Sequence, residues 1–200
     1  MDIKNISYSM VQSHTFPGIL LEFEIFLAFQ LFSPANIIHK VFDFAQANIS
    51  NLVSSIALFF VFATILGFML DGIHHYIFRK KEDDTNKIYE YINSLERMQI
   101  ARSLLDDDLW YPYEAFANIW IAMMPGLILL PYWMLSLHFH LAFVISIMAV
   151  YVVVFEIMRR EAITTLDTYK EVEVDLIKAF KAKAPKADTY KSGKAESEEE

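Results

Sequence analysis

Residues 51–78 have the sequence NLVSSIALFFVFATILGFMLDGIHHYIF, and this stretch decides the fold. It is apolar over most of its length, and its polar groups gather toward the far end, at Asp71, His74 and His75. A helix needs about 20 predominantly apolar residues to cross a bilayer. We therefore expect residues 51–78 to form a transmembrane helix.

Three more stretches of this kind flank it, at residues 17–38, 116–135 and 138–158. The whole chain agrees with this pattern, because 55% of its 200 residues are hydrophobic. The predicted fold class is all-α, a polytopic membrane protein with a bundle of four transmembrane helices over residues 17–160. The third span contains Pro125-Gly126, where a missing backbone donor should kink the helix. The lipid bilayer is the first expected partner.

Lysine and arginine are unevenly distributed between the spans. Residues 39–50 contain only Lys40, and the 132–140 turn contains neither residue type. The cations gather in the 79–115 loop and after the fourth span, beginning with Arg159 and Arg160. The positive-inside rule then places this loop and both termini in the cytoplasm, including the 1–16 segment. The expected localisation is integral to the cell or cytoplasmic membrane.

Two helical pieces are expected outside the membrane. Apolar residues recur at helical spacing over 84–105, with Asp83 or Asp84 as the N-cap and the Asp106–Asp108 run as the end. This cytoplasmic amphipathic helix could cover the bundle or contact a partner, either a second copy of the chain or another membrane protein. The fourth span should continue as a cytoplasmic helical extension over 161–183. Residues 184–200 lack periodicity and should form a disordered tail.

Several function classes are excluded or disfavoured by composition. The chain has no cysteine, so disulfides, thiolate metal sites and cysteine nucleophiles are excluded. Its net charge is −8, and no basic face is visible, so a nucleic-acid partner is not expected. We identify neither a nucleophile elbow nor a glycine-rich phosphate loop.

One cluster of ionisable residues stands out, because such groups are costly inside a membrane. Asp71, His74 and His75 are spaced i, i+3, i+4 and share one side of their helix. Glu22 of the first span should lie at a similar depth and face inward, whereas Glu24 is turned away. Carboxylates and imidazoles bind divalent transition metals, so Glu22, Asp71, His74 and His75 form a predicted metal site, for example for zinc. The same groups could instead relay protons or balance one another's charge.

These observations leave three hypotheses for function. The first is a structural, regulatory or accessory component of a membrane. The second is a membrane-embedded metal-dependent enzyme acting on a lipid or lipid-linked substrate at the cytoplasmic leaflet, where the metal would activate a bound water. The third is a small transporter or pore, which the lack of a continuous polar stripe along any span disfavours.

Overall fold

The computed structural model describes residues 11–32, 49–82, 87–92 and 94–183, and the regular structure within these ranges is helical. Predictions for residues 1–10, for the 33–48 segment, for an Asp83 or Asp84 cap and for the 184–200 tail lie outside the described residues. The elements in chain order are η1 (Val11–Thr15), α2 (Phe16–Phe32), α4 (Ile49–Glu82), η2 (Lys87–Tyr91), α5 (Leu95–Ala101), η3 (Arg102–Trp110), α6 (Tyr111–Ala122), α7 (Gly126–Ser136) and α8 (Leu141–Lys183).

Three helical segments are long and apolar enough to cross a membrane: Ser13–Phe32, Ile56–Phe78 and α8. A fourth candidate is the helical stretch that ends in α6 and α7, which is bent by 43° and passes the same test when its two parts are taken together. The all-α prediction is therefore confirmed for the described residues. By length and composition, the described residues contain three to four candidate membrane spans.

The break in the third span lies at Met123–Pro125. α6 ends at Ala122, and the N–H of Met124 donates to Ile121 O at 3.1 Å, a tighter turn than an α-helix makes. Pro125 has no N–H to continue the ladder, and α7 begins at the next residue. The predicted kink at Pro125 is thus confirmed, and it takes the form of an interruption between two short helices.

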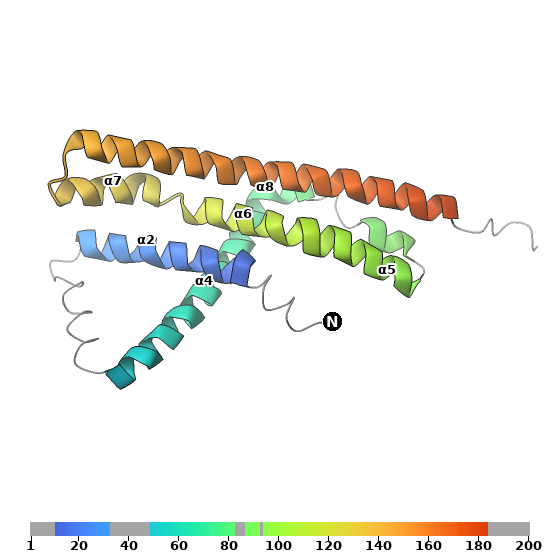
Figure 1. The fold of residues 1–200 in the computed structure, drawn as a ribbon, viewed down its shortest axis with the longest axis horizontal. Helices are drawn as coiled ribbons and strands as arrows, with labels where there is room; N and C mark the ends of the chain where they lie inside the picture. The colour runs from blue at the N-terminus through green and yellow to red at the C-terminus, as the bar shows by residue number, and fades with distance from the viewer. Residues whose placement is uncertain (1–10, 33–48, 83–86, 93, 184–200) are drawn as a thin grey trace, which may run out of the picture.

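The longest element is α8, which has 43 residues. At 1.5 Å per residue this helix is about 64 Å long, twice the roughly 30 Å of a hydrocarbon core. It lies beside α7, α6 and α5 in turn (Figure 1). The helix continues through Arg159 and Arg160 to Lys183, as the sequence predicts. The apolar first half of α8 is long enough to cross the hydrocarbon core, so its second half extends beyond that layer.

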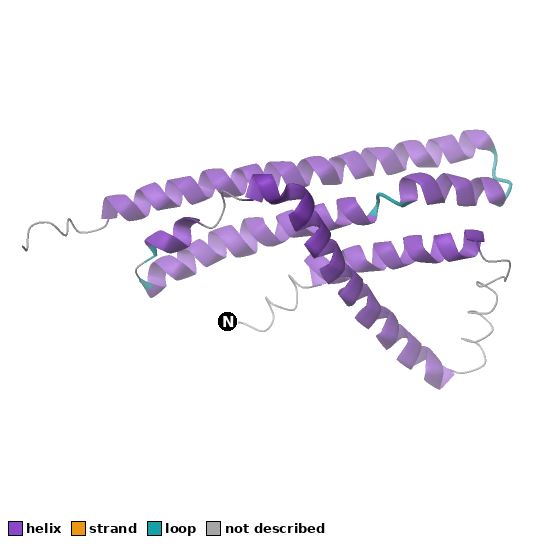
Figure 2. Cartoon of the chain, turned by 180° about the vertical axis from the view of Figure 1, so that it is seen from behind, coloured by secondary structure: helices purple, strands orange, loops and turns teal. Residues whose placement is uncertain are grey.

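α4 is in direct backbone contact with α2 and with the preceding η1 through two glycines. A Cβ built on Gly18 would collide with Ala63 O, and one on Gly67 would collide with His14 O. α4 crosses α2 and the remaining helices obliquely (Figure 2). Small residues allow this close approach, which is a common way for membrane helices to associate. The glycine contacts also set the register of the two helices.

We call η2, α5, η3 and the part of α8 after Arg160 the projection. Its helices differ from the prediction in two respects. Residues 84–105 do not form one helix: η2 ends at Tyr91, and α5 starts after Ser94, whose side chain accepts a hydrogen bond from Arg97 N. The Asp106–Asp108 run does not end the helix either, because η3 carries it into α6. Leu105, within η3, is fully buried in a core with Tyr169 and Phe180 of α8. Packing on α8 outweighs the weak helix propensity of three aspartates.

Candidate functional site

A polar cluster lies where η1, α4 and α6 meet. Asp71, His74 and His75 come from α4, His14 comes from η1, and Asn118 comes from α6. α4 contacts both of the other elements. The three α4 residues share one side of their helix, because their spacing matches the helical period.

Asp71 is surrounded by imidazole rings. Its Oδ1 lies 3.4 Å from His74 Nδ1 and 3.9 Å from His14 Nε2, and its Oδ2 lies 3.7 Å from His75 Nε2. These distances exceed the 2.7–3.2 Å of a typical N–H···O hydrogen bond. The three rings, which come from two elements, therefore interact with the carboxylate through electrostatics more than through short hydrogen bonds.

Asn118 joins the three elements, and its partners determine how it is oriented. Its Nδ2 donates to the backbone carbonyl of Ser13 at 2.8 Å, and its Oδ1 lies 2.7 Å from His74 Nδ1. A carbonyl can only accept, so the NH₂ group must face Ser13 and the amide oxygen must face His74. His74 Nδ1 must then be the donor and hold the ring proton. Both Asn118 and His74 are completely buried.

The depth of the cluster follows from the pairing of α6 with α8. Tyr151 of α8 donates to Met123 O, whereas Tyr113 and Ala117 share a buried cluster with Leu166. Asn118 lies between these two contacts, near the level of Arg159 and Arg160. The cluster therefore lies near the end of the apolar part of α8, close to Arg159 and Arg160.

Within the part of the chain that the structure describes, two groups of residues could hold a metal ion. Asp71, His74 and His75 form one group, and His14, Asp71 and Glu114 form the other, with the ligand atoms of each group within 4.8 Å of one another. Imidazole nitrogen and carboxylate oxygen are common zinc ligands. Binding through His74 Nδ1 would have to displace its hydrogen bond to Asn118.

Glu22, the remaining member of the predicted set, is in neither group. Gly18 faces Ala63 and Gly67 faces His14, so α2 and α4 are antiparallel and Glu22 lies near the level of Phe59. About 12 residues of helix, or roughly 18 Å, separate that level from Asp71. The expected match in depth fails, because depths counted from two predicted span ends do not give the register between two helices.

The expectation that Glu22 faces inward and Glu24 outward is also wrong. Glu24 is the buried carboxyl, 6% exposed, and its Oε1 lies 3.0 Å from the Tyr151 hydroxyl oxygen. Glu22 is only partly buried. Glu22 and Gly18 share one side of the helix by their i, i+4 spacing, but α2 packs against α4, α6 and α7 and so has no single inward side.

Sequence reasoning missed His14 as a member of the site. It lies just before the first apolar run, where a polar residue is ordinary, and only the α4 register brings it to Asp71. Its Nδ1 lies 2.6 Å from Ser13 Oγ, and Thr15 of the same turn lies 3.1 Å from Thr64 through the two hydroxyl oxygens. The polar triplet Ser13-His14-Thr15 was the available signal.

Other ionisable groups form ordinary surface interactions. His138 and His140 are exposed at the turn between α7 and α8. Glu156 pairs with Arg160 at 2.8 Å and also with Arg159. Asp106 accepts hydrogen bonds from the Tyr89 hydroxyl at 3.0 and 3.1 Å. Burial and the neighbouring Asp106 carboxyl raise the pKa of Tyr89 to about 12.

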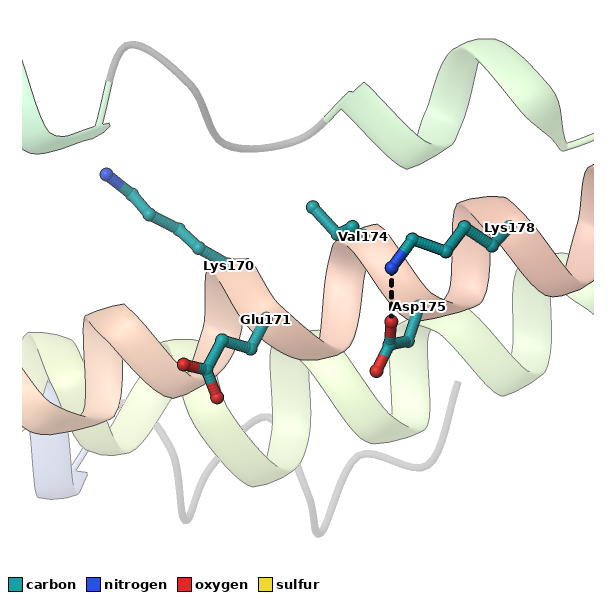
Figure 3. Close-up of a pocket in the computed structure, with 5 residues that line it drawn as sticks. All are labelled: Lys170, Glu171, Val174, Asp175 and Lys178. Atoms are coloured by element: carbon teal, nitrogen blue, oxygen red, sulfur yellow. Dashed lines mark hydrogen bonds and ion pairs between the residues drawn. The ribbon is translucent and has the colours of Figure 1, made fainter.

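A surface depression on the projection offers no built site. Its lining residues are Lys170, Glu171, Val174, Asp175 and Lys178 (Figure 3). All five belong to α8, and Lys178 pairs with Asp175 at 3.0 Å. Side chains of one helix paired in this way are typical of a solvated face.

Comparison of the chain with protein families, with curated proteins and with solved structures finds no match.

Proposed function

We propose that this chain is a structural or accessory component of a membrane, in which a multi-pass bundle supports a helical projection that contacts another protein. The partner is either a second copy of the chain or another membrane protein. The distribution of lysine and arginine favours an orientation with the projection and both termini in the cytoplasm.

The length of α8 is the observation that supports this proposal. One helix supplies both a candidate span and, after Arg160, half of the projection. The projection has its own buried core, in which Ile88 and Leu105 pack against Tyr169 and Phe180. A partner held there would be coupled to the bundle through continuous helix, which suits an assembly role.

α5 and η3 are the part of the projection that would make this contact. Both expose apolar side chains, with Leu95 and Met98 on one side and Ile100 and Leu104 on another. Leu95 is 72% exposed. Apolar side chains grouped on an extramembrane surface are typical of protein contacts.

The test is the assembly state of the protein purified in mild detergent after cross-linking. We expect a complex larger than one chain, and we expect a Leu95→Glu and Leu104→Glu double variant to lose it while the bundle stays folded. Val174→Glu is the matched control, since Val174 is also exposed but lies on α8. A monomer in every case, without any cross-linked partner, would reject an assembly role.

The second candidate function is the metal-dependent membrane enzyme, which the two ligand groups around Asp71 favour. The group of His14, Asp71 and Glu114 could hold an ion without displacing Asn118 from His74. A metal there would lower the pKa of a bound water near the headgroups of one leaflet, where a lipid or lipid-linked substrate could be attacked.

Elemental analysis of the purified protein separates the two candidates. The enzyme hypothesis expects near-stoichiometric zinc or another divalent transition ion, depleted by Asp71→Asn, since Asp71 belongs to both groups, and by His14→Ala if the group with Glu114 holds the ion. Glu24→Gln is the control that should retain the metal, because Glu24 contacts Tyr151 on another part of the bundle. Metal-free protein from metal-supplemented growth would exclude this hypothesis.

A further inference from the structure

A second polar site lies deep in the bundle, beside the break in the third span. Its centre is Glu24, near the middle of α2, with 6% of its surface exposed. The Glu24 carboxyl contacts the hydroxyl of Tyr151, which lies eight residues before Arg159 on α8. At 1.5 Å per residue, the site is about 12 Å inside the charged boundary.

The break supplies the third polar atom of this site. Tyr151 Oη lies 3.0 Å from Glu24 Oε1 and 2.8 Å from the carbonyl oxygen of Met123. In a continuous helix the N–H of Leu127 would bond to that carbonyl, but it donates to Met124 O instead. The interruption at Pro125 thus frees the Met123 carbonyl to accept a hydrogen bond from another helix.

Gly126 provides the space in which these groups meet. A Cβ built on Gly126 would collide with both Tyr151 Oη and Glu24 Oε1. A side chain at the start of α7 would therefore separate the carboxyl from the hydroxyl. The break and the glycine act together to bring α2, α7 and α8 into contact at one point.

The surroundings of Glu24 lack a compensating charge. Among the described residues, none forms an ion pair with Glu24, and Glu24 Oε2 is buried without a hydrogen-bond partner. Residues 115–136 of the third span and 56–70 of α4 contain no Asp, Glu, His, Lys or Arg. Tyr151 faces Glu24 from α8, and Glu22 is the other carboxyl on α2. An unpaired carboxylate at this depth would cost several kcal/mol.

Counting hydrogens identifies the state that satisfies both short contacts. A tyrosine hydroxyl has one hydrogen to donate, and both Met123 O and an ionised Glu24 can only accept. With an ionised carboxylate, one of the two contacts would bring two acceptors together without a hydrogen between them. With a protonated carboxyl, Glu24 donates to Tyr151 Oη, and Tyr151 donates to the Met123 carbonyl.

We propose that Glu24, Tyr151 and the Met123 carbonyl form a proton-binding site at the break of the third span, in which Glu24 holds the proton. The bound proton completes a hydrogen-bond chain that links α2, the α6–α7 break and α8. Its loss would put an uncompensated carboxylate in the apolar layer and would leave Tyr151 with two competing acceptors. The packing of α2 on α7 and α8 is therefore coupled to proton binding.

The test is the infrared spectrum of the full-length protein in lipid vesicles at pH 8, in the region of the protonated carboxyl C=O stretch. We expect a band that shifts on transfer to heavy water. Glu24→Gln should lose it, and the matched variant Glu22→Gln should retain it. Tyr151→Phe removes the acceptor for the Glu24 hydrogen, so the band should move to the higher frequency of a carboxyl with fewer hydrogen bonds.

Two outcomes would overturn the proposal. One is a wild-type spectrum without a protonated carboxyl band. The other is a band that survives Glu24→Gln, whether or not Glu22→Gln removes it. If Glu24→Gln fails to fold, the Tyr151→Phe spectrum decides, because a band at an unchanged frequency would mean that the proton is not shared with Tyr151.

Discussion

At the scale of single residues, Asn118 of α6 is notable because it bonds to two other elements, η1 and α4. Its two amide atoms bind groups on two other elements, the Ser13 carbonyl and the His74 ring. It also lies 3.5 Å from Asp71 Oδ1. Asn118 is completely buried, so water cannot replace its amide. Removing the amide would therefore cost the Ser13 carbonyl and the His74 ring their hydrogen bonds to it.

We therefore predict that Asn118→Ala destabilises the bundle by about 1–2 kcal/mol. The measurement is unfolding of the purified protein in detergent by increasing denaturant. Ser146→Ala is the control, since the Ser146 hydroxyl is exposed and bonds only within its own helix, to Ala142 O. Equal effects of the two substitutions would show that the network around Asn118 does not hold the helices together.

Glu173 gives a pH dependence outside the candidate spans. Its side chain is 2% exposed and accepts the backbone N–H of Ile88 at 2.9 Å. Burial raises the pKa of Glu173, and this exceeds the opposite effect of the Ile88 and Lys87 backbone hydrogen bonds and the Lys87 charge. The folded protein therefore binds this proton more tightly than the unfolded chain does. Its contribution to stability is complete below pH 4.5 and is lost as the pH rises through the folded-state pKa.

Glu173→Gln should remove this loss while keeping an oxygen for Ile88 N–H. We predict that the variant melts at a higher temperature than the wild type at pH 7.5, and that the difference shrinks at pH 4.5. Glu171→Gln, an exposed neighbour on α8, is the control. A difference that is the same at both pH values would contradict the assigned protonation.

At the scale of elements, backbone contact between helices is possible only where a side chain is missing. α4 contains two glycines, Gly67 and Gly72. Gly67 touches the backbone of η1, whereas a Cβ on Gly72 would meet no atom within 4 Å. The two glycines have the same local conformation and different surroundings.

This contrast predicts opposite effects of one substitution. Gly67→Ala should destabilise the protein by about 1–3 kcal/mol or more, because η1 must move away. Gly72→Ala should stabilise it by up to about 1 kcal/mol, since alanine is the better helix former. Denaturant unfolding of both variants in the same detergent is the measurement. A stable Gly67→Ala protein would mean that η1 does not pack against α4.

At the scale of the whole molecule, the chain has a membrane bundle and a projection on one side of it. The two parts share α8 and the continuous run from α5 to α6, which lie side by side along the molecule (Figure 1). The α7–α8 turn lies at the opposite end from the projection (Figure 1). The proposed orientation therefore assigns these two ends to opposite sides of the membrane.

Single cysteines test that orientation directly, since the natural chain has none. Ser103 lies on the projection and Ser136 lies near the α7–α8 turn, and both are exposed. In intact cells we expect an impermeant thiol reagent to label Ser136→Cys and to label Ser103→Cys only after lysis. Labelling of Ser103→Cys in sealed cells would invert the topology and place the Asp71 cluster at the outer boundary.

The sequence by itself determined the helical class, the candidate spans, the break at Pro125 and the length of α8. Each depends on residues that are neighbours in the chain: apolar length, a missing N–H, or an uninterrupted helical period. The α4 members of the cluster, Asp71, His74 and His75, were predictable for the same reason, because one helix fixes their spacing.

Only the tertiary structure decided which residues of other helices join them. His14 reaches Asp71 and Glu22 does not, because the Gly18 and Gly67 contacts set the register of α2 on α4. Glu24 is buried because Tyr151, 127 residues away, meets it beside the Met123 carbonyl. Register and facing between helices depend on side chains of both partners, so the periodicity of either sequence alone leaves them undetermined.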